Sequence, residues 1–97
     1  MRIAIPRETH PGEDRVPITP DVAKKLVRMG ADLVIESGMG TGSGYPDAAY
    51  SDAGATISND RNELFSSADL FMRLRKPEVD EIALMKRGAI HISYLDP

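Results

Sequence analysis

The feature that most constrains the fold of this chain is a regular alternation of short apolar runs with segments that favour helices. Residues 2–6 form a β-rich run, residues 20–29 place apolar side chains at helical spacing, and residues 32–36 form a second apolar run. Two strands joined by a helix within about 35 residues are typical of a βαβ unit, whose strands are parallel and whose crossover is right-handed. The beginning of the sequence therefore predicts an α/β fold.

The same alternation continues along the rest of the chain. Further helices are expected over residues 46–53, 60–67 and 77–85, and further strands over residues 55–58, 70–75 and 89–95. This pattern predicts a flavodoxin-like, three-layer α/β domain with an open, mostly parallel five-stranded sheet. A chain of 97 residues suffices for one domain. Because a parallel sheet needs cover on both faces and no helix follows the last predicted strand, we expect this domain to be truncated from a longer chain.

The composition argues against several classes of partner. The 12 basic and 15 acidic residues are interspersed and give a formal charge of −3, so we expect no nucleic acid and no anionic membrane as partner. With no cysteine and only two isolated histidines, no disulfide and no metal site are expected. The apolar runs are far shorter than the ~20 residues of a membrane span, and the N-terminus lacks the apolar core of a signal peptide. We therefore expect a cytoplasmic chain without direct membrane insertion.

A glycine-rich run at residues 38–44 (GMGTGSG) stands where a dinucleotide-binding fingerprint would lie. The GxGxxG spacing fails, however, because the third glycine of each possible triple is replaced by Ser43, Tyr45 or Asp47. The run also follows the second predicted strand rather than the first. It is interpreted as a flexible or tightly turned surface loop, with contact to a ligand or a neighbouring domain as the alternative.

Ligands of open α/β sheets bind outside the carboxyl ends of the strands, so the charged residues at that edge are candidates for a site. They are Arg7, Glu8, His10 and Arg15 after the first strand, Glu36 at the end of the second, Arg73 and Arg75 in the fourth, and Asp96 after the fifth. Arginine binds carboxylate or phosphate through two parallel hydrogen bonds, which makes Arg15 and Arg75 candidate anion-binding residues. The alternative is structural, with Arg15 paired to neighbouring acids and Arg75 solvated beyond the sheet.

The remaining candidates are weaker. Period-2 alternation places Arg73 on the same face of its strand as Phe71, and a structural pairing is expected for it. His91 lies roughly 16 Å along a strand from Asp96, so a packed or surface histidine is expected there rather than a general base. The sequence shows no Ser-His-Asp spacing, carboxylate pair or P-loop, and no catalytic residue is assigned.

Several segments in a fixed order together resemble a known family. They are residues 2–8 (RIAIPRE), 11–20 (PGEDRVPITP), 36–47 (ESGMGTGSGYPD), 53–55 (AGA), 70–77 (LFMRLRKP) and 80–84 (DEIAL). This set resembles the N-terminal domain shared by alanine dehydrogenase and the α subunit of proton-translocating NAD(P) transhydrogenase. The resemblance implies that residues 1–97 form the non-Rossmann domain of a two-domain enzyme, which closes over a cleft against a later domain that binds most of the NAD.

The two branches of the family imply different residues at the cleft. Alanine dehydrogenases have an arginine at the position of Arg15, a lysine at that of Arg75 and a histidine at that of Asp96, which together hold and protonate a keto acid. Only Arg15 matches. Arg75 could still hold a carboxylate but cannot easily exchange a proton, and Asp96 is ionised at neutral pH unless its environment raises its pKa.

The transhydrogenase branch needs no acid or base here, because hydride passes directly between two nicotinamides. We therefore expect the N-terminal domain of a transhydrogenase α subunit, an oxidoreductase that transfers hydride between NAD(H) and NADP(H), with Arg15, Arg75 and Asp96 at the cleft. The implied partners are the Rossmann domain, the β subunit at the inner membrane and further copies of the chain in a homo-oligomer. The alternatives are an alanine or other amino-acid dehydrogenase and a stand-alone binding module. The 97 residues alone are expected to be inactive.

Overall fold

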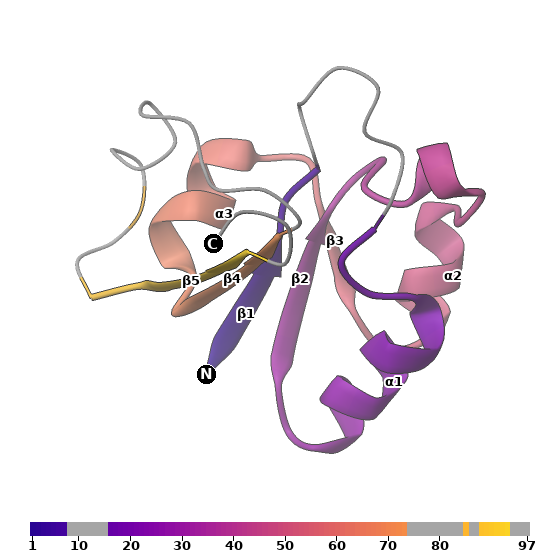
Figure 1. Cartoon of the computed structure of the whole chain (residues 1–97), viewed down its shortest axis with the longest axis horizontal. Coiled ribbons are helices and arrows are strands. Elements are labelled where there is room, and N and C mark those ends of the chain that lie inside the picture. The colour runs from indigo at the N-terminus through magenta and orange to yellow at the C-terminus, as the bar shows by residue number, and fades with distance from the viewer. Residues whose placement is uncertain (8–15, 74–84, 86–87, 94–97) are drawn as a thin grey trace.

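The computed structural model describes residues 1–7, 16–73, 85 and 88–93, which fold as a parallel sheet with helices on both faces (Figure 1). Among these residues the strands are β1 (Arg2–Ile5), β2 (Asp32–Glu36), β3 (Thr56–Ser58), β4 (Leu70–Arg73) and β5 (Ile90–Ser93). The helices are α1 (Pro20–Arg28), the 3₁₀ turn η1 (Thr41–Ser43), α2 (Asp47–Asp52) and α3 (Arg61–Ser67). Each coincides closely with a segment predicted from the sequence, except η1, which was not predicted.

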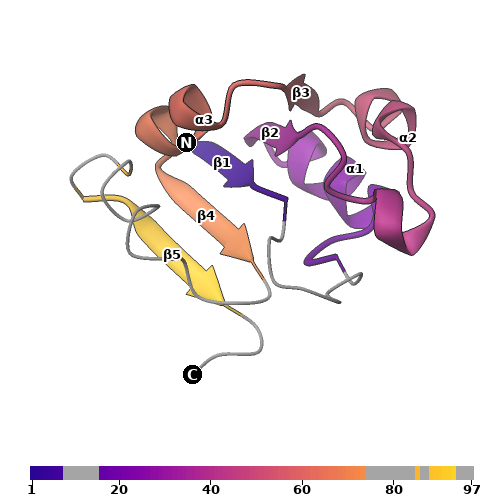
Figure 2. The same cartoon turned by 90° about the horizontal axis from the view of Figure 1, so that it is seen from above.

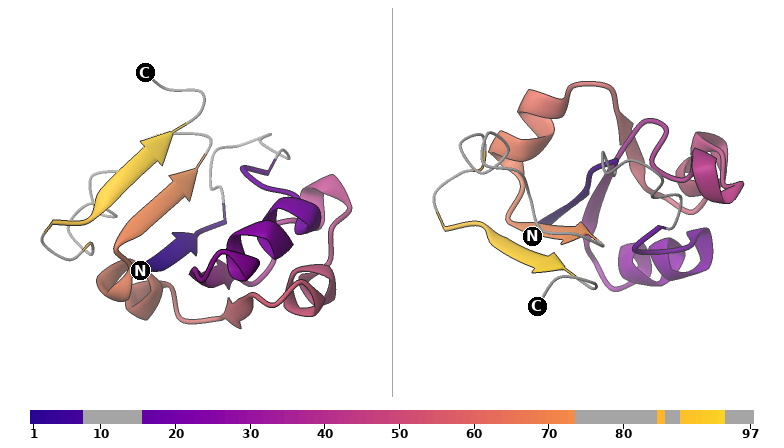
Figure 3. Two further views of the ribbon diagram at one scale, coloured as in Figure 1. Left: turned by 90° about the horizontal axis from the view of Figure 1, so that it is seen from below. Right: turned by 45° about the horizontal axis from the view of Figure 1, so that its top comes forward.

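The strand order is β3-β2-β1-β4-β5, and every neighbouring pair is parallel. In the left view of Figure 3, the arrows of β1, β4 and β5 (indigo, orange and yellow) point in one direction. The expected open parallel sheet is thus confirmed. Without β3, the order β2-β1-β4-β5 follows the 2-1-3-4 sequence of flavodoxin-like sheets, and β3 is a short extra strand outside β2. The order reverses between β1 and β4, so the topological switch point lies at the carboxyl ends of these two strands.

One face of the sheet is covered by α1 and α2. Helix α1 begins at Pro20, directly after the N-cap Thr19, whose hydroxyl accepts a hydrogen bond from the amide of Val22. The buried side chains of this layer include Ile3, Ile5, Leu33, Ile35, Ala23 and Tyr50. Their alternation along β1 and β2 is the period-2 pattern of strands that send every second side chain to one face.

The other face is covered by α3, which Figure 2 shows across the sheet from α1 and α2. The carboxylate of Asp60 caps this helix by accepting a hydrogen bond from the amide of Glu63 at 3.1 Å. Leu64 and Phe65 of α3 are buried against the sheet, and the rings of Phe65 and Phe71 stack with their centroids 5.1 Å apart. The second layer is therefore an aromatic core over β1, β2 and β4.

Cover of the sheet is uneven among the described residues. Helix α1 contacts β2 and α2 contacts β3. Ile90 and Ile92 of β5 are paired in register with Leu70 and Met72, which point to the same side as α1, and they stay 55% and 39% exposed. The helix expected over residues 77–85 lies outside the described residues apart from Met85, which packs against the α3 layer.

Candidate functional site

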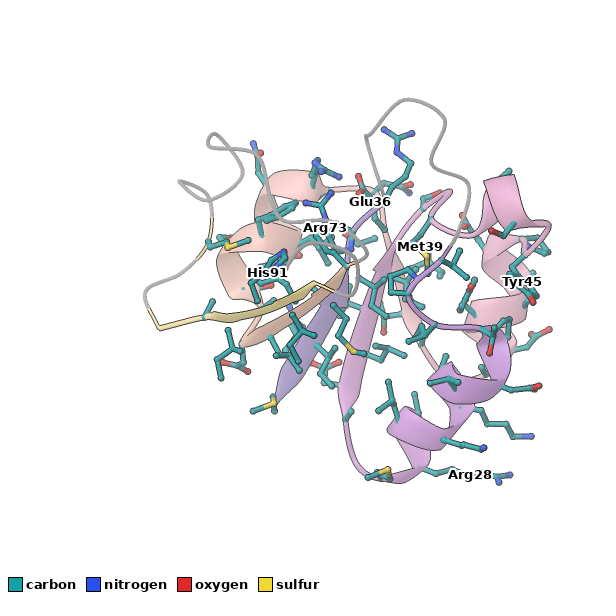
Figure 4. The ribbon with its side chains drawn as sticks, in the orientation of Figure 1. Arg28, Glu36, Met39, Tyr45, Arg73 and His91 are labelled. Carbon is teal, nitrogen blue, oxygen red and sulfur yellow. The ribbon has the colours of Figure 1, made fainter. Side chains whose placement is uncertain are left out.

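The carboxyl ends of β1, β2 and β4 bring several charged groups to one edge of the molecule. β1 is followed by the buried Pro6 and the exposed Arg7, β2 ends at Glu36, and β4 ends at Arg73. Figure 4 shows Glu36 and Arg73 near this edge, at the end of the sheet opposite Arg28. The switch point of the sheet is thus bordered by groups that can bind anions or hold a loop.

The three residues predicted to bind substrate or cofactor, Arg15, Arg75 and Asp96, lie outside the described residues, as do Glu8 and His10. Their convergence at this edge stays a prediction. Arg15 belongs to the first loop (residues 7–19), which joins β1 to α1, and Arg75 is two positions after Arg73. What the structure describes is their neighbours along the chain, which are Arg7 and residues 16–19 of the first loop and Arg73 at the end of β4.

Glu36 joins three elements at this edge. Its residue is 8% exposed, and its Oε1 accepts a hydrogen bond from the backbone amide of Arg7 at 2.7 Å. The same oxygen forms an ion pair with Nη1 of Arg61, in the first turn of α3. The Arg61 guanidinium also lies 4.9 Å above the ring of Phe65. Because hydrogen bonds to an ionised acceptor are the strong ones, Glu36 holds the start of the first loop and the start of α3 to the end of β2.

Two residues weighed in the sequence are packed into the α3 layer. Arg73 is 1% exposed and shares the face of Phe71, as the alternation predicted. The ring of His91 stacks on Phe71 with centroids 6.5 Å apart, opposite it in the register of β4 and β5. His91 is therefore a packed histidine, one of the two states expected for it. The structural pairing expected for Arg73 stays a prediction, and the burial of Arg73 agrees with it.

The glycine-rich run is a tightly turned loop, as expected. Asp47, the first residue of α2, accepts hydrogen bonds from the Ser37 hydroxyl at 2.6 Å and from the Gly38 amide at 2.8 Å. These two hydrogen bonds, the one from Ser37 first, lower the pKa of Asp47. Gly40 packs so closely that a Cβ there would lie 2.7 Å from both Tyr45 O and Tyr50 Cε2. The hydrogen bonds of Asp47 and the close packing at Gly40 therefore both serve to close the loop itself.

Tyr50 ties this loop to the segment before α1. Its ring is fully buried, and its hydroxyl donates to the carbonyl oxygen of Ile18 at 2.9 Å. Burial, with a smaller contribution from Tyr45, raises the pKa of Tyr50 to about 12, so the hydroxyl stays a donor at neutral pH. The end of the first loop is therefore fixed by a side chain of α2.

The profile of the family described as alanine dehydrogenase/PNT, N-terminal domain, matches residues 4–97. The chain belongs to this family. The resemblance expected from the sequence is thereby confirmed.

Relatives from both branches of the family match almost the whole chain. An NAD(P) transhydrogenase subunit alpha of Rhodospirillum rubrum is 43% identical over 100 residues, which cover 98% of this chain and 26% of that protein. The alanine dehydrogenase of Halomonas elongata is 35% identical over 95 residues, which cover 98% of this chain and 26% of that protein. The crystal structure of transhydrogenase from Sinorhizobium meliloti superposes with a TM-score of 0.88 at 34% identity, over 96% of this chain and 27% of that one. The chain thus spans about a quarter of the length of these relatives.

In this member of the alanine dehydrogenase/PNT family, one cavity among the described residues lies away from the switch point. It has a volume of about 760 Å³ and lies over β2 and β3, where Val34, Thr56 and Ser58 line it together with residues 59–63 and Arg2. Two of its charged lining groups pair with each other, because Arg2 bridges to Glu63 at 3.2 Å, and Arg2 also bridges to Asp32 outside the lining at 3.0 Å. These partners, Asp32 foremost, raise the pKa of Arg2 further.

Two negative findings hold for the described part of the chain. Within it, no three His, Cys, Asp or Glu side chains gather in a way that could hold a metal ion. None of the helices seen there is both long enough and apolar enough to cross a bilayer.

The sequence indicated which edge of the sheet carries charged residues, but it did not indicate the contacts that Glu36 and Tyr50 make there. Glu36 was noted only as a charged residue at a strand end, and Arg61, Asp47 and Tyr50 were given no role at the site. A charge that ends a buried apolar run such as residues 32–36 signals a buried partner, because an unpaired buried carboxylate is costly. Nothing in the sequence indicates that the partner is Arg61, 25 residues further on.

Proposed function

We propose that this chain is the N-terminal domain of the α subunit of a proton-translocating NAD(P) transhydrogenase, and that the complete enzyme transfers hydride between NAD(H) and NADP(H). The observation that carries the proposal is the 43% identity with the transhydrogenase subunit of Rhodospirillum rubrum, against 35% with the alanine dehydrogenase of Halomonas elongata. Arg75 and Asp96, where the other branch has a lysine and a histidine, support the same choice.

Residues 1–97 are proposed to be one wall of a cleft whose other wall is a Rossmann domain in the rest of a two-domain chain. The exposure of Ile90 and Ile92 supports further protein over this side of the sheet, since parallel sheets are covered on both faces. The coverage of only about a quarter of each relative is in keeping with this.

In the proposed cleft, Arg15 and Arg75 hold anionic groups of the dinucleotide, and Asp96 accepts hydrogen bonds from it. The glycine-rich loop does not fit a phosphate-binding role, because the Gly38 amide donates to Asp47 and Gly40 is packed against Tyr50. NAD is therefore assigned mainly to the Rossmann domain, and this chain contributes side chains at the switch point between β1 and β4.

The nicotinamides supply the hydride chemistry once both are bound. The residues of this chain would orient the dinucleotide, because the guanidinium groups of Arg15 and Arg75 restrict how it can lie in the cleft. No proton need be exchanged at Arg15 or Arg75, and both keep their charge at any physiological pH. The proposed partners are the β subunit and a further copy of the chain, at the membrane surface.

The test compares two activities of the complete enzyme, prepared with its partner subunits in membrane vesicles. We expect reduction of NADP⁺ by NADH, and no oxidation of NADH by pyruvate with ammonium. The 97-residue chain alone should show neither activity, because it lacks the domain assigned to NAD. NADH oxidation that requires pyruvate and ammonium would instead support the second candidate.

That second candidate is an amino-acid dehydrogenase, in which a keto acid lies between Arg15 and Arg75. It is favoured by the 35% identity with an alanine dehydrogenase and by Arg15, which matches that branch. It requires a proton donor for the substrate oxygen or nitrogen, a role for which an ionised Asp96 is unsuited.

A further inference from the structure

We propose that Arg7 is a further binding residue, whose guanidinium holds a phosphate group of the dinucleotide at the carboxyl ends of β1 and β2, next to the switch point. The inference rests on the proposed function, which brings a dinucleotide to this edge of the sheet. It deepens that function because it assigns a phosphate contact to a side chain that the proposed cleft does not yet include.

The backbone of Arg7 is held in place at this edge. Arg7 follows the carboxyl end of β1, with only the buried Pro6 between them. Its amide donates to Oε1 of Glu36 at 2.7 Å, and the Glu36 side chain is only 11% exposed. Arg61 binds the same carboxylate from the first turn of α3. The backbone of Arg7 is therefore fixed to the end of β2, although the residue itself is exposed.

The side chain of Arg7 extends beside the glycine-rich loop. A Cβ on Gly38 would lie 3.8 Å from Cδ of Arg7, which is ordinary van der Waals contact. Because the guanidinium is bonded to this Cδ, the positive charge lies beside the start of the loop, where β2 has ended. Ligands of open parallel sheets bind outside the carboxyl ends of the strands. The charge of Arg7 thus lies on the side from which a ligand approaches.

Neither of the two carboxylates near this position forms an ion pair with the guanidinium of Arg7. Glu36 is bound by the Arg7 amide and by Arg61, which balances its charge. Asp47 is engaged by the hydrogen bonds that close the glycine-rich loop. Among the described residues the Arg7 side chain has no ion pair, so no described partner has to be displaced before it binds an anion.

A phosphate group of the dinucleotide is the anion that fits this position. Arginine binds phosphate through two parallel hydrogen bonds, and the anionic groups of NADH are the phosphates that join its nucleosides. The Gly38 amide already donates to Asp47, so Arg7 supplies a donor that the loop itself does not. The carboxylate of a keto acid has the same hydrogen-bonding chemistry, and the experiment therefore distinguishes these two sources.

The decisive variant is Arg7→Gln in the complete enzyme. Arg28→Gln is the matched control, because Arg28 is also exposed but lies at the opposite end of the molecule (Figure 4). Both variants lose one positive charge, and Arg7→Gln keeps the backbone amide that binds Glu36. The dissociation constant of NADH, followed by its fluorescence, should rise about tenfold in Arg7→Gln and stay unchanged in Arg28→Gln. An unchanged dissociation constant in Arg7→Gln overturns the proposal.

A conservative variant tests the geometry of the contact. Arg7→Lys keeps the charge but loses the planar fork, so the dissociation constant of NADH should rise by only about threefold. The effects of both Arg7 variants should shrink as the salt concentration rises, because the contact is between charges at an exposed edge. A tenfold rise in Arg7→Lys that does not respond to salt overturns the proposal, since charge would then play no part.

Shorter ligands identify the group that Arg7 contacts. ADP and adenosine differ in their phosphates, and both are measured by displacement of bound NADH. Arg7→Gln should weaken the binding of ADP about tenfold and leave that of adenosine unchanged. Equal effects on the two ligands overturn the proposal. A raised KM for pyruvate, measured with NADH and ammonium, together with unchanged binding of NADH would assign Arg7 to a keto-acid carboxylate and also overturns it.

The binding measurements separate this inference from the proposed function. If the wild-type enzyme binds NADH but does not reduce NADP⁺, the proposed function fails, and the comparison of Arg7→Gln with Arg28→Gln still decides the role of Arg7. If the wild type reduces NADP⁺ and all variants bind NADH equally, the proposed function stands and the inference fails. A complete enzyme that binds no NADH overturns both.

Discussion

Arg61, in the first turn of α3, forms an ion pair with the buried carboxylate of Glu36 at the end of β2. Helix α3 covers the face of the sheet opposite α1, through a layer that contains Phe65 and Phe71. The ion pair joins the α3 layer to the edge of the sheet where ligands of such folds bind. It also means that the carboxylate of Glu36 is held by a residue outside its own βαβ unit.

Removing Arg61 should therefore destabilise the fold. Arg61→Ala leaves Glu36 buried with the Arg7 amide as its remaining partner here, and it also removes the guanidinium over Phe65. We expect a loss of about 2 kcal/mol in the free energy of unfolding, measured by urea denaturation. Arg28→Ala is the control, because Arg28 is exposed at the opposite end of the molecule (Figure 4) and should change stability by less than about 0.5 kcal/mol. Equal effects of the two substitutions would contradict the account.

Gly40→Ala should also be costly, for a purely steric reason. Its φ of −99° suits any residue, but the added Cβ would lie 2.7 Å from the Tyr45 carbonyl oxygen and from Tyr50. We expect a loss of about 2 kcal/mol by urea denaturation. The matched change is Gly44→Ala, where φ is 85° and no atom lies within 4 Å, so only backbone strain of about 1 kcal/mol is expected. A larger loss for Gly44→Ala would show that the packing of the loop is misjudged.

The hydrogen bonds of Asp47 predict an acid-dependent stability. They lower its pKa in the folded chain below the value of about 3.9 in an unfolded one, so their contribution is present above that value and is lost as the pH falls through the folded pKa. Asp47→Asn should cost about 1 kcal/mol at neutral pH. The difference from the wild type, followed by urea midpoints, should shrink below about pH 4. A difference that stays constant or grows in acid would refute this role.

The buried phenol of Tyr50 predicts that the stability of the fold falls at alkaline pH. Its pKa of about 12 lies above the value of about 10 in an unfolded chain, so the contribution is full below about pH 10 and is lost as the pH rises towards 12. Thermal unfolding should become steeply easier over this interval in the wild type and in Tyr45→Phe. In Tyr50→Phe the dependence should be weaker. Identical alkaline profiles for the three proteins would exclude a buried phenol as its cause.

The order of elements could be predicted from the sequence because it follows from burial. Residues 33–35 form an uninterrupted apolar run, which is typical of a strand covered on both faces, and all three are buried in β2. The alternation along β4 likewise placed Phe71 and Arg73 on one face. Small differences arose at helix starts. Pro46 was expected inside the second helix, but it is the N-cap of α2, whose first residue is Asp47.

The order of the strands in the sheet and the long-range contacts at its edge could not be predicted in this way. Nothing in the short run at residues 56–58 indicates that it pairs outside β2 rather than beside β4, because strand order depends on where each crossover returns. The contacts of Glu36 with Arg61 and of Tyr50 with Ile18 join residues 25 and 32 positions apart. Such contacts depend on how the layers stack, which residue spacing does not encode. The positions of Arg15, Arg75 and Asp96 stay predictions.

The most direct test of the proposed activity follows one hydride. The complete enzyme would receive NADH deuterated at the transferable position of its nicotinamide, together with NADP⁺, pyruvate and ammonium, and mass spectrometry would locate the deuterium. The account predicts deuterium on the nicotinamide of NADPH and none in alanine, because hydride passes directly between the two dinucleotides. Deuterium recovered in alanine, with unlabelled NADP⁺ left unreduced, would contradict it.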